Sequence, residues 1–195
     1  MKDGLTVYFV RHGQTDWNFA RRIQGQIDIE INETGRMQAA DNGRRLKDLR
    51  PDICSQHFIA SPLKRCRQTM EIIREIVGLP HTGYQTDDRL KEINFGTWQG
   101  RHWSDFASLD AKVTAQRAAD PYNWRPEGGE SYADLATRVG DWLATLEQDT
   151  VVVSHGGVSR AFREHFLNIT ARDVTELPVP QDKILIMRKG EAIWA

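Results

Sequence analysis

The sequence is poor in cysteine and in long apolar runs. Two cysteines, Cys54 and Cys66, are too few for a disulfide framework in a chain of 195 residues, and neither has a second cysteine at metal-finger spacing. No apolar run approaches the roughly 18 residues that a membrane span needs, and the first residues lack the pattern of a secretory signal. We therefore predict a cytoplasmic protein with free thiols and no membrane contact.

An excess of charge of one sign is also missing. The chain holds 26 lysines and arginines against 27 acidic residues, whereas nucleic-acid-binding proteins carry a large basic field. The six histidines form no HExxH pair, and the sequence has neither a P-loop nor a dinucleotide glycine fingerprint. We predict no nucleic-acid partner, no metal and no cofactor, so a few well-placed cations must hold any anionic ligand.

The composition predicts one folded unit with an α/β pattern. Apolar residues make up 39% of the chain, and no repeat or Pro/Ser-rich linker divides it, so residues 1–195 are interpreted as a single domain. Short apolar runs predict buried strands, and apolar residues at helical spacing follow them. The expected elements are strands at 5–10, 57–60 and 150–154, helices at 32–49, 61–77, 131–146 and 156–167, and a terminal hairpin at 184–187 and 191–194. Strands that alternate with helices indicate a three-layer sandwich, with helices on both faces of a mostly parallel central sheet.

Two details of this assignment concern helix ends and faces. Asn32 and Ser61 are suitable N-caps for the helices that follow them. Met37, Ala40 and Leu46 are spaced so that we expect them on the buried face of the first helix.

Basic residues are expected at one edge of the sheet. Arg11 and His12 follow the first strand, Arg65 lies near the start of the helix after the second, and His155 follows the strand at 150–154. Ligands of open α/β sheets bind beyond the carboxyl ends of the strands, where helix N-termini and guanidinium groups hold anions. A single basic residue there is more often a solvated loop residue. Two His-Gly steps together with a third cation favour a phosphate site without deciding for it.

The residues around these positions resemble a known family. Residues 11–18, RHGQTDWN, are similar to the signature of the histidine phosphatase superfamily, which includes the cofactor-dependent phosphoglycerate mutases. Further segments resemble that family's motifs in the same order, namely 24–25 with 32–35, 61–69, 90–100, 126–131 and 153–157. Six motifs in order are far more specific than any one of them. The resemblance implies a phosphoglycerate mutase-like fold.

The resemblance also implies a mechanism through a phosphohistidine. His12 is the implied nucleophile, and a neutral imidazole is a competent one near neutral pH. Glu92 is the implied general acid and later base. Arg11, Arg65 and His155 are implied to act in catalysis by binding the phosphoryl group, whose oxygens gain charge during transfer. Substrate or phosphate contacts are also implied for Asn18, Gln24, Gly25 and Gly156, with turn chemistry as the alternative for the first three.

Two segments near the implied acid vary within the family. Gln99 stands where many relatives have a carboxylate, which puts only details around Glu92 in doubt. Residues 101–125 mix aromatic and basic residues, and in the family such an insertion covers the active site. We predict a lid with an apolar wall and some cations; the alternative is a helical cap whose aromatic residues pack inward. The residues concerned are Trp103, Phe106, Tyr122, Trp124, Arg101, Lys112, Arg117 and Arg125.

The resulting hypothesis is a metal-independent phosphomonoesterase that hydrolyses a small phosphorylated metabolite. The short stretch after His155 favours water as the acceptor, because mutases of this family usually carry a tail over the site. A phosphoglycerate mutase that uses 2,3-bisphosphoglycerate as cofactor is the first alternative, and a non-catalytic phosphate-binding or interaction module is the second.

Relatives favour a homodimer, but the sequence leaves the oligomeric state open. The edge of the terminal hairpin could pair across a two-fold axis, and Lys183, Arg188 and Lys189 could equally protect it from pairing.

Overall fold

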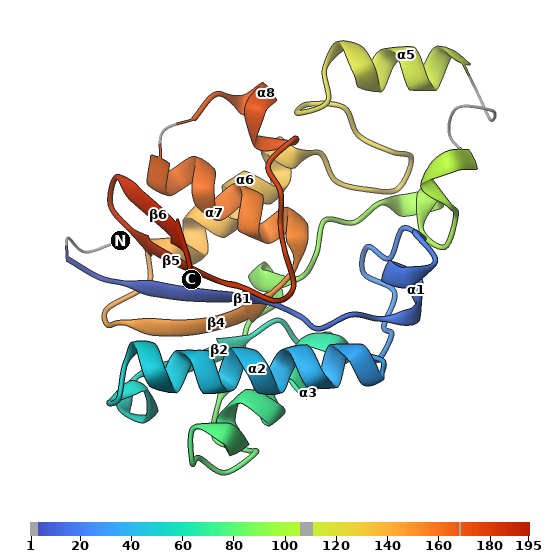
Figure 1. Ribbon diagram of the computed structural model, residues 1–195. Coiled ribbons are helices and arrows are strands. Elements are labelled where there is room, and N and C mark those ends of the chain that lie inside the picture. Colours follow the sequence, from blue (N-terminus) through green and yellow to red (C-terminus); the bar gives the residue numbers. More distant parts are fainter. Residues whose placement is uncertain (1–3, 106–110, 168) are drawn as a thin grey trace.

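A six-stranded mixed sheet forms the middle layer of the molecule (Figure 1). The computed structural model describes residues 4–105, 111–167 and 169–195, and its strand order is β3-β2-β4-β1-β5-β6. The strands are β1 (Val7–Arg11), β2 (His57–Ala60), β3 (Gln85–Thr86), β4 (Thr150–Ser154), β5 (Ile184–Arg188) and β6 (Glu191–Trp194). The first four in that order run parallel, while β5 and β6 continue the sheet antiparallel beyond β1. The mostly parallel sheet and the terminal hairpin are confirmed.

Helices cover both faces of this sheet, which confirms the three-layer sandwich. One layer consists of α2 (Glu33–Leu49) and α3 (Lys64–Ile76), and the other of α6 (Tyr132–Leu143) and α7 (Gly156–Leu167). Three shorter helices, α1 (Asp16–Phe19), α5 (Ala111–Ala119) and α8 (Ala171–Val174), lie outside these pairs. Short 3-10 segments occupy Ile53–Ser55, Asp88–Leu90, Gly96–Trp98 and Trp103–Asp105. None of the helices within the described ranges is long and apolar enough to cross a membrane.

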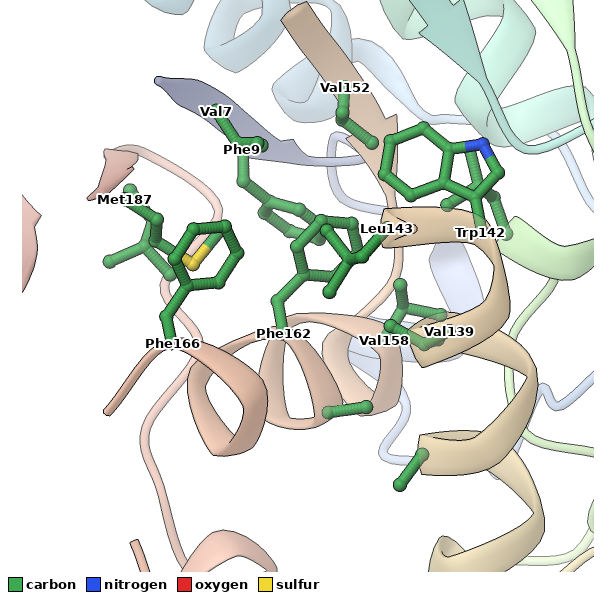
Figure 2. Packing of buried hydrophobic residues seen from close by; sticks show 14 of the residues in the cluster. Val7, Phe9, Val139, Trp142, Leu143, Val152, Val158, Phe162, Phe166 and Met187 are labelled. Carbon is green, nitrogen blue, oxygen red and sulfur yellow. The ribbon is translucent and has the colours of Figure 1, made fainter. Parts of the chain in front are cut away.

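Alternation along the strands sends successive side chains into two separate cores. On β1, Val7 and Phe9 pack against α6 and α7, while Tyr8 and Val10 pack against α2 and α3. Figure 2 shows the first core, in which the ring of Phe162 lies 5.2 Å from that of Phe9 between ring centroids. Burial of each large apolar side chain contributes about 1.5–3 kcal/mol. The sheet is therefore fixed on both faces, and its strand ends form a rigid edge.

The predicted face of α2 is wrong in one respect. Met37 is 55% exposed, and the helix buries Leu46 together with small or polar residues. At Gly43 an added Cβ would lie 2.9 Å from the side chain of Ile76, so α2 and α3 pack too closely there for a larger residue. The contact face of α2 is therefore selected by size and not by hydrophobicity.

The predicted cap of α3 is also wrong. The helix begins at Lys64, and its N-cap Leu63 makes no side-chain capping bond. The hydroxyl of Ser61 instead lies 2.7 Å from Nε2 of His155. Ser61 thus serves the strand-end cluster described next.

Candidate active site

The carboxyl ends of β1, β2 and β4 bring the two histidines of the His-Gly steps together. These strands are neighbours in register, and the backbone N–H groups of His12 and Ser61 donate to the carbonyls of Ser154 and Val153 at 2.9 and 3.0 Å. The next residue after Ser154 is His155, and its ring centroid lies 5.2 Å from that of His12. The structure therefore places both residues at one edge, as the topology requires.

The hydrogen bonding of His12 determines which ring nitrogen can react. Nδ1 lies 2.8 Å from the carbonyl oxygen of Gly13, and a carbonyl can only accept, so Nδ1 carries the proton. Nε2 then keeps its lone pair. Burial lowers the pKa of His12 well below 6.5, and the nearby charges of Arg65 and Arg11 lower it further. The imidazole is therefore neutral at pH 7, and the lone pair of Nε2 carries no proton.

Two guanidinium groups flank this imidazole, that of the fully buried Arg65 and that of the partly buried Arg11. Arg65 donates from Nη2 to the carbonyl of Gly25 at 2.7 Å and from Nη1 to that of Ile27 at 2.8 Å. Arg11 donates from Nη1 to the carbonyl of Val179 at 2.6 Å, and its buried Nε has no hydrogen-bond partner among the described residues. Burial lowers the pKa of Arg11 to about 10, which still leaves it charged at neutral pH. Both groups have N–H donors remaining for an anion.

His155 is buried next to Arg65. The Arg65 Nε–H group points to Nδ1 of His155 at 3.3 Å, and because a guanidinium only donates, Nε2 must carry the imidazole proton and donate to Ser61. The ring is fully buried, with the thiol of Cys66 3.4 Å from Nε2. Burial also raises the pKa of Cys66 to about 12, so this thiol is uncharged. In this arrangement His155 orients Arg65, and its direct contact with phosphate stays a prediction.

Glu92 reaches the same edge from the loop after the 3-10 segment at Asp88–Leu90. Its Oε1 accepts from the backbone N–H groups of Ile93 at 2.9 Å and Gly157 at 3.0 Å. An added Cβ on Gly157 would lie 2.4 Å from that oxygen, so a larger residue there would displace the carboxyl group. The carbonyl of Glu92 accepts from Arg138 at 3.0 Å and from Gln26 at 2.9 Å. Glu92 is therefore held both at its carboxyl group and at its backbone carbonyl.

Helix α1 and the loop after it contain the other residues for which substrate contacts are predicted. Gly25 adopts a φ of +52°, and a Cβ there would lie 2.1 Å from Oε1 of Gln99. The same Gln99 oxygen accepts from the N–H of Gln26 at 2.6 Å, so this residue braces the loop that holds Arg65. The Oδ1 atom of Asn18 accepts from the backbone of Thr15 at 3.2 Å, as part of the capping box of α1.

A cavity of about 450 Å³ opens above these groups. Of the predicted site residues, it is lined by Arg11, His12, Asn18, Gln24, Gly25, Arg65, Glu92 and Gly156. Polar and charged groups thus converge on one hollow, which suits a phosphorylated ligand. Among the described residues there is no group of three or more His, Cys, Asp or Glu side chains that could hold a metal ion.

Residues 101–125 contribute both to a wall of this cavity and to the core. Trp103, Trp124 and Arg117 line the cavity, and the guanidinium of Arg117 lies 5.4 Å from the Trp103 ring centroid. Tyr122 faces the protein instead, where its hydroxyl donates to Glu164 at 2.6 Å. Phe106 lies outside the described residues. The described part of this segment thus lines the cavity and also packs inward, while its action as a lid stays a prediction.

Comparison with known proteins assigns the family. The profile of the "Histidine phosphatase superfamily (branch 1)" matches residues 7–194. The chain belongs to this superfamily. Similar proteins include the "Probable phosphoglycerate mutase GpmB" of Erwinia tasmaniensis, with 37% identity over 157 residues that span 78% of this chain and 70% of the relative. The "Glucosyl-3-phosphoglycerate phosphatase" of Mycobacterium tuberculosis is 33% identical over 175 residues, which span 82% of this chain and 74% of that protein.

Solved structures agree with this membership. A mycobacterial glucosyl-3-phosphoglycerate phosphatase, solved in complex with VO3, superposes with a TM-score of 0.77 at 27% identity, covering 98% of each chain. The phosphoglycerate mutase-like fold implied by the sequence is thereby confirmed.

Several residues around this histidine phosphatase site escaped the sequence analysis. Gly157 lies within a motif that was recognised, and the clash of its Cβ with Glu92 explains the second glycine there. Arg138 on α6 and Gln181 in the loop before β5 support Glu92 and His12 through the backbone. Both lie far from the motifs they support, so no local sequence signal identifies them.

Proposed function

We propose that this histidine phosphatase is a phosphomonoesterase that works through a phosphohistidine on His12. The observation that carries the proposal is the bond from Nδ1–H of His12 to the carbonyl of Gly13, which leaves a neutral Nε2 beside two arginines at the bottom of a cavity. Covalent catalysis needs an unprotonated nucleophile of this kind. Arg11 and Arg65 supply positive charge for the phosphoryl oxygens, which is why the proposed reaction requires no metal ion.

The proposed reaction has two displacements. In the first, Nε2 of His12 attacks phosphorus, the ester P–O bond breaks, and the leaving alkoxide takes a proton from Glu92. In the second, the Glu92 carboxylate takes a proton from water, the water oxygen attacks phosphorus, and the P–N bond breaks to release inorganic phosphate. His155 acts through Arg65, and Gln24, Gly25 and Gly156 border the phosphate position. The acid and the nucleophile lie in the same cavity, as this sequence of steps needs.

The residues that line the cavity favour a leaving group with both an apolar part and a negatively charged part. Phe95, Trp103 and Trp124 supply an aromatic surface, and Arg22 and Arg117 add positive charge beyond the phosphate position. We propose a small phosphorylated substrate whose alcohol part carries a second negative charge. The name of the similar mycobacterial phosphatase, whose substrate is a phosphoglycerate derivative, is in line with this class.

A cofactor-dependent phosphoglycerate mutase is the second candidate. The similar protein of Erwinia tasmaniensis carries that name, and the same phosphohistidine chemistry would serve it. In that case 2,3-bisphosphoglycerate would be the cofactor, and the phosphohistidine would pass its phosphoryl group to a second hydroxyl and not to water.

Phosphorus NMR separates the two candidates. The protein is incubated without added metal with 3-phosphoglycerate, a trace of 2,3-bisphosphoglycerate, and phosphomonoesters with and without a carboxylate. We expect inorganic phosphate, released faster from the carboxylate-bearing esters. A 2-phosphoglycerate signal with little free phosphate identifies a mutase, and no reaction together with no acid-labile phosphohistidine leaves a binding module.

Variants at the nucleophile test the assignment directly. We expect His12→Ala to abolish turnover in a protein that still folds, while His81→Ala, which changes an exposed histidine, serves as the matched control. Turnover by a folded His12→Ala variant equal to that of the control contradicts the proposal.

A further inference from the structure

The segment from Leu177 to Asp182 is attached to the site by side-chain donors. It lies between α8 and β5 and has no regular secondary structure. Five of its carbonyl oxygens accept hydrogen bonds of 2.6–3.0 Å from side chains of β1, α2 and α7. The donors are Arg160 to Leu177, Arg163 to Pro178, Arg11 to Val179, Asn42 to Gln181 and Arg45 to Asp182. Such anchoring fixes the position of the one amide side chain in the segment, that of Gln181.

Gln181 and Thr15 together fix the orientation of the Asn18 amide, and the hydroxyl of Thr15 lies 3.1 Å from Oδ1 of Asn18. Nε2 of Gln181 donates to the backbone carbonyl of His12 at 2.9 Å and to Oδ1 of Asn18 at 3.2 Å. Because the His12 carbonyl can only accept, the Gln181 atom must be the amide nitrogen, and its neighbour in Asn18 must be the oxygen. The N–H of Thr15, which can only donate, contacts the same oxygen at 3.2 Å. Two obligate donors therefore hold Oδ1 on the protein side.

The opposite end of the Asn18 amide is its donor. Asn18 lines the cavity beside His12 and Arg11, so with Oδ1 held by the protein, Nδ2 is the group left for a ligand. The oxygens of a phosphate dianion only accept hydrogen bonds. An Asn18 turned the other way would present an acceptor to them and repel them.

We propose that Gln181 is a positioning residue that keeps Nδ2 of Asn18 directed at the substrate phosphate. This inference rests on the proposed function, because it assumes that a phosphoryl group occupies the cavity. Gln181 touches no substrate atom itself. It acts through the Asn18 amide, and its bond to the His12 carbonyl ties that amide to the nucleophile's backbone.

A double-mutant cycle on phosphate binding tests this role. Gln181→Met removes both N–H donors at similar volume, and Asn18→Ala removes the amide through which Gln181 would act. Affinity for inorganic phosphate is measured by titration calorimetry on the full chain. In the presence of Asn18 we expect Gln181→Met to weaken binding about tenfold, the size of one charge-assisted hydrogen bond. In the Asn18→Ala background the same change should weaken binding by less than about twofold, since the amide is already gone.

Controls separate this result from a loss of folding. Gln148→Met changes an exposed glutamine outside the cavity and should leave phosphate affinity unchanged. Thermal unfolding verifies that each variant is folded. Equal weakening in both backgrounds, or no weakening at all, overturns the positioning role.

The same titration distinguishes the two proposals. If the unaltered protein binds phosphate with the expected coupling but hydrolyses no ester, the proposed hydrolase is wrong and the role of Gln181 in phosphate binding stands. If hydrolysis is observed without coupling, only the role of Gln181 is wrong. If the unaltered protein neither binds phosphate nor hydrolyses an ester, both are overturned.

Discussion

Substitution of Gly157 by alanine should displace the proposed general acid. The backbone N–H of Gly157 donates to Oε1 of Glu92 at 3.0 Å, and an alanine Cβ would lie 2.4 Å from that oxygen. An ordinary contact at this position begins near 3.4 Å. The same Cβ would also lie 3.2 Å from Leu135, which limits its retreat in that direction. The Glu92 carboxyl must therefore move by roughly 1 Å, the scale at which misplacement of a catalytic group costs about a hundredfold in rate.

The loss should depend on the leaving group. A hundredfold reduction corresponds to about 2.7 kcal/mol in the barrier, and it applies only where the leaving oxygen needs the proton of Glu92. We expect the first-turnover release of alcohol from 3-phosphoglycerate to fall about a hundredfold, and that of p-nitrophenol from its phosphate to fall less than about threefold. Rapid-quench measurement of the first turnover isolates this step from the later hydrolysis of the phosphohistidine.

The neighbouring glycine provides the matched comparison. A Cβ on Gly156 would have its nearest contact at 3.7 Å, to Arg11, so Gly156→Ala adds the same methyl group without moving Glu92. Gly156→Ala should therefore change the first-turnover rates of the two esters by the same factor. If Gly157→Ala slows both esters equally, or neither, then the contact with Glu92 does not control proton transfer and the reasoning fails.

Two further perturbations test the electrostatics and the core. Burial lowers the pKa of His12 and His155 well below 6.5. Below pH 6.5 the unfolded chain therefore binds protons at these two residues that the folded chain does not. Their contribution to the free energy of unfolding is fully present above pH 6.5 and is lost as the pH falls below it. Urea unfolding at pH 7.5 and 5.5 should show a loss that is smaller in His12→Asn by up to about 1.4 kcal/mol, because about one pH unit of this interval lies below 6.5. An unchanged pH dependence in the variant would contradict the assignment. Phe162→Ala should lower the free energy of unfolding, measured in urea, by about 3–5 kcal/mol, because the buried ring of Phe162 contacts Phe9 and Trp142. A loss below about 1 kcal/mol would mean that neighbouring side chains move into the cavity left by the ring.

Segments with a strong apolar pattern were predicted well from the sequence. The runs that became β1, β2 and β4 are buried on both faces of the sheet, so almost every residue in them is apolar. The stripe of Leu135, Val139 and Trp142 identified α6 because those residues recur at helical spacing and face a single core. By contrast β3, Gln85–Thr86, consists of two exposed polar residues at the sheet edge and has no such pattern.

Predictions failed where packing depends on size or on distant partners. The buried face of α2 includes Gly43 and Asn42, which carry no hydrophobic signal, and this is why Met37 was misplaced. Ser61 satisfies the local rule for an N-cap, yet its hydroxyl oxygen accepts a hydrogen bond from His155, which is 94 residues away in the sequence. The motif residues could be assigned to the site because the family resemblance covers them. The residues that orient them, such as Gln181 and Arg138, depend on contacts that only the folded chain brings together.

The central place of β1 in the sheet has a consequence for folding during synthesis. Both neighbours of β1, β4 at Thr150–Ser154 and β5 at Ile184–Arg188, leave the ribosome long after it does. At about 5–20 residues per second, the apolar strand Val7–Arg11 waits roughly seven to thirty seconds for its first partner. During that interval the nascent chain exposes a β-prone segment, and the sheet edge that holds His12 and His155 is assembled only after residue 154 has emerged.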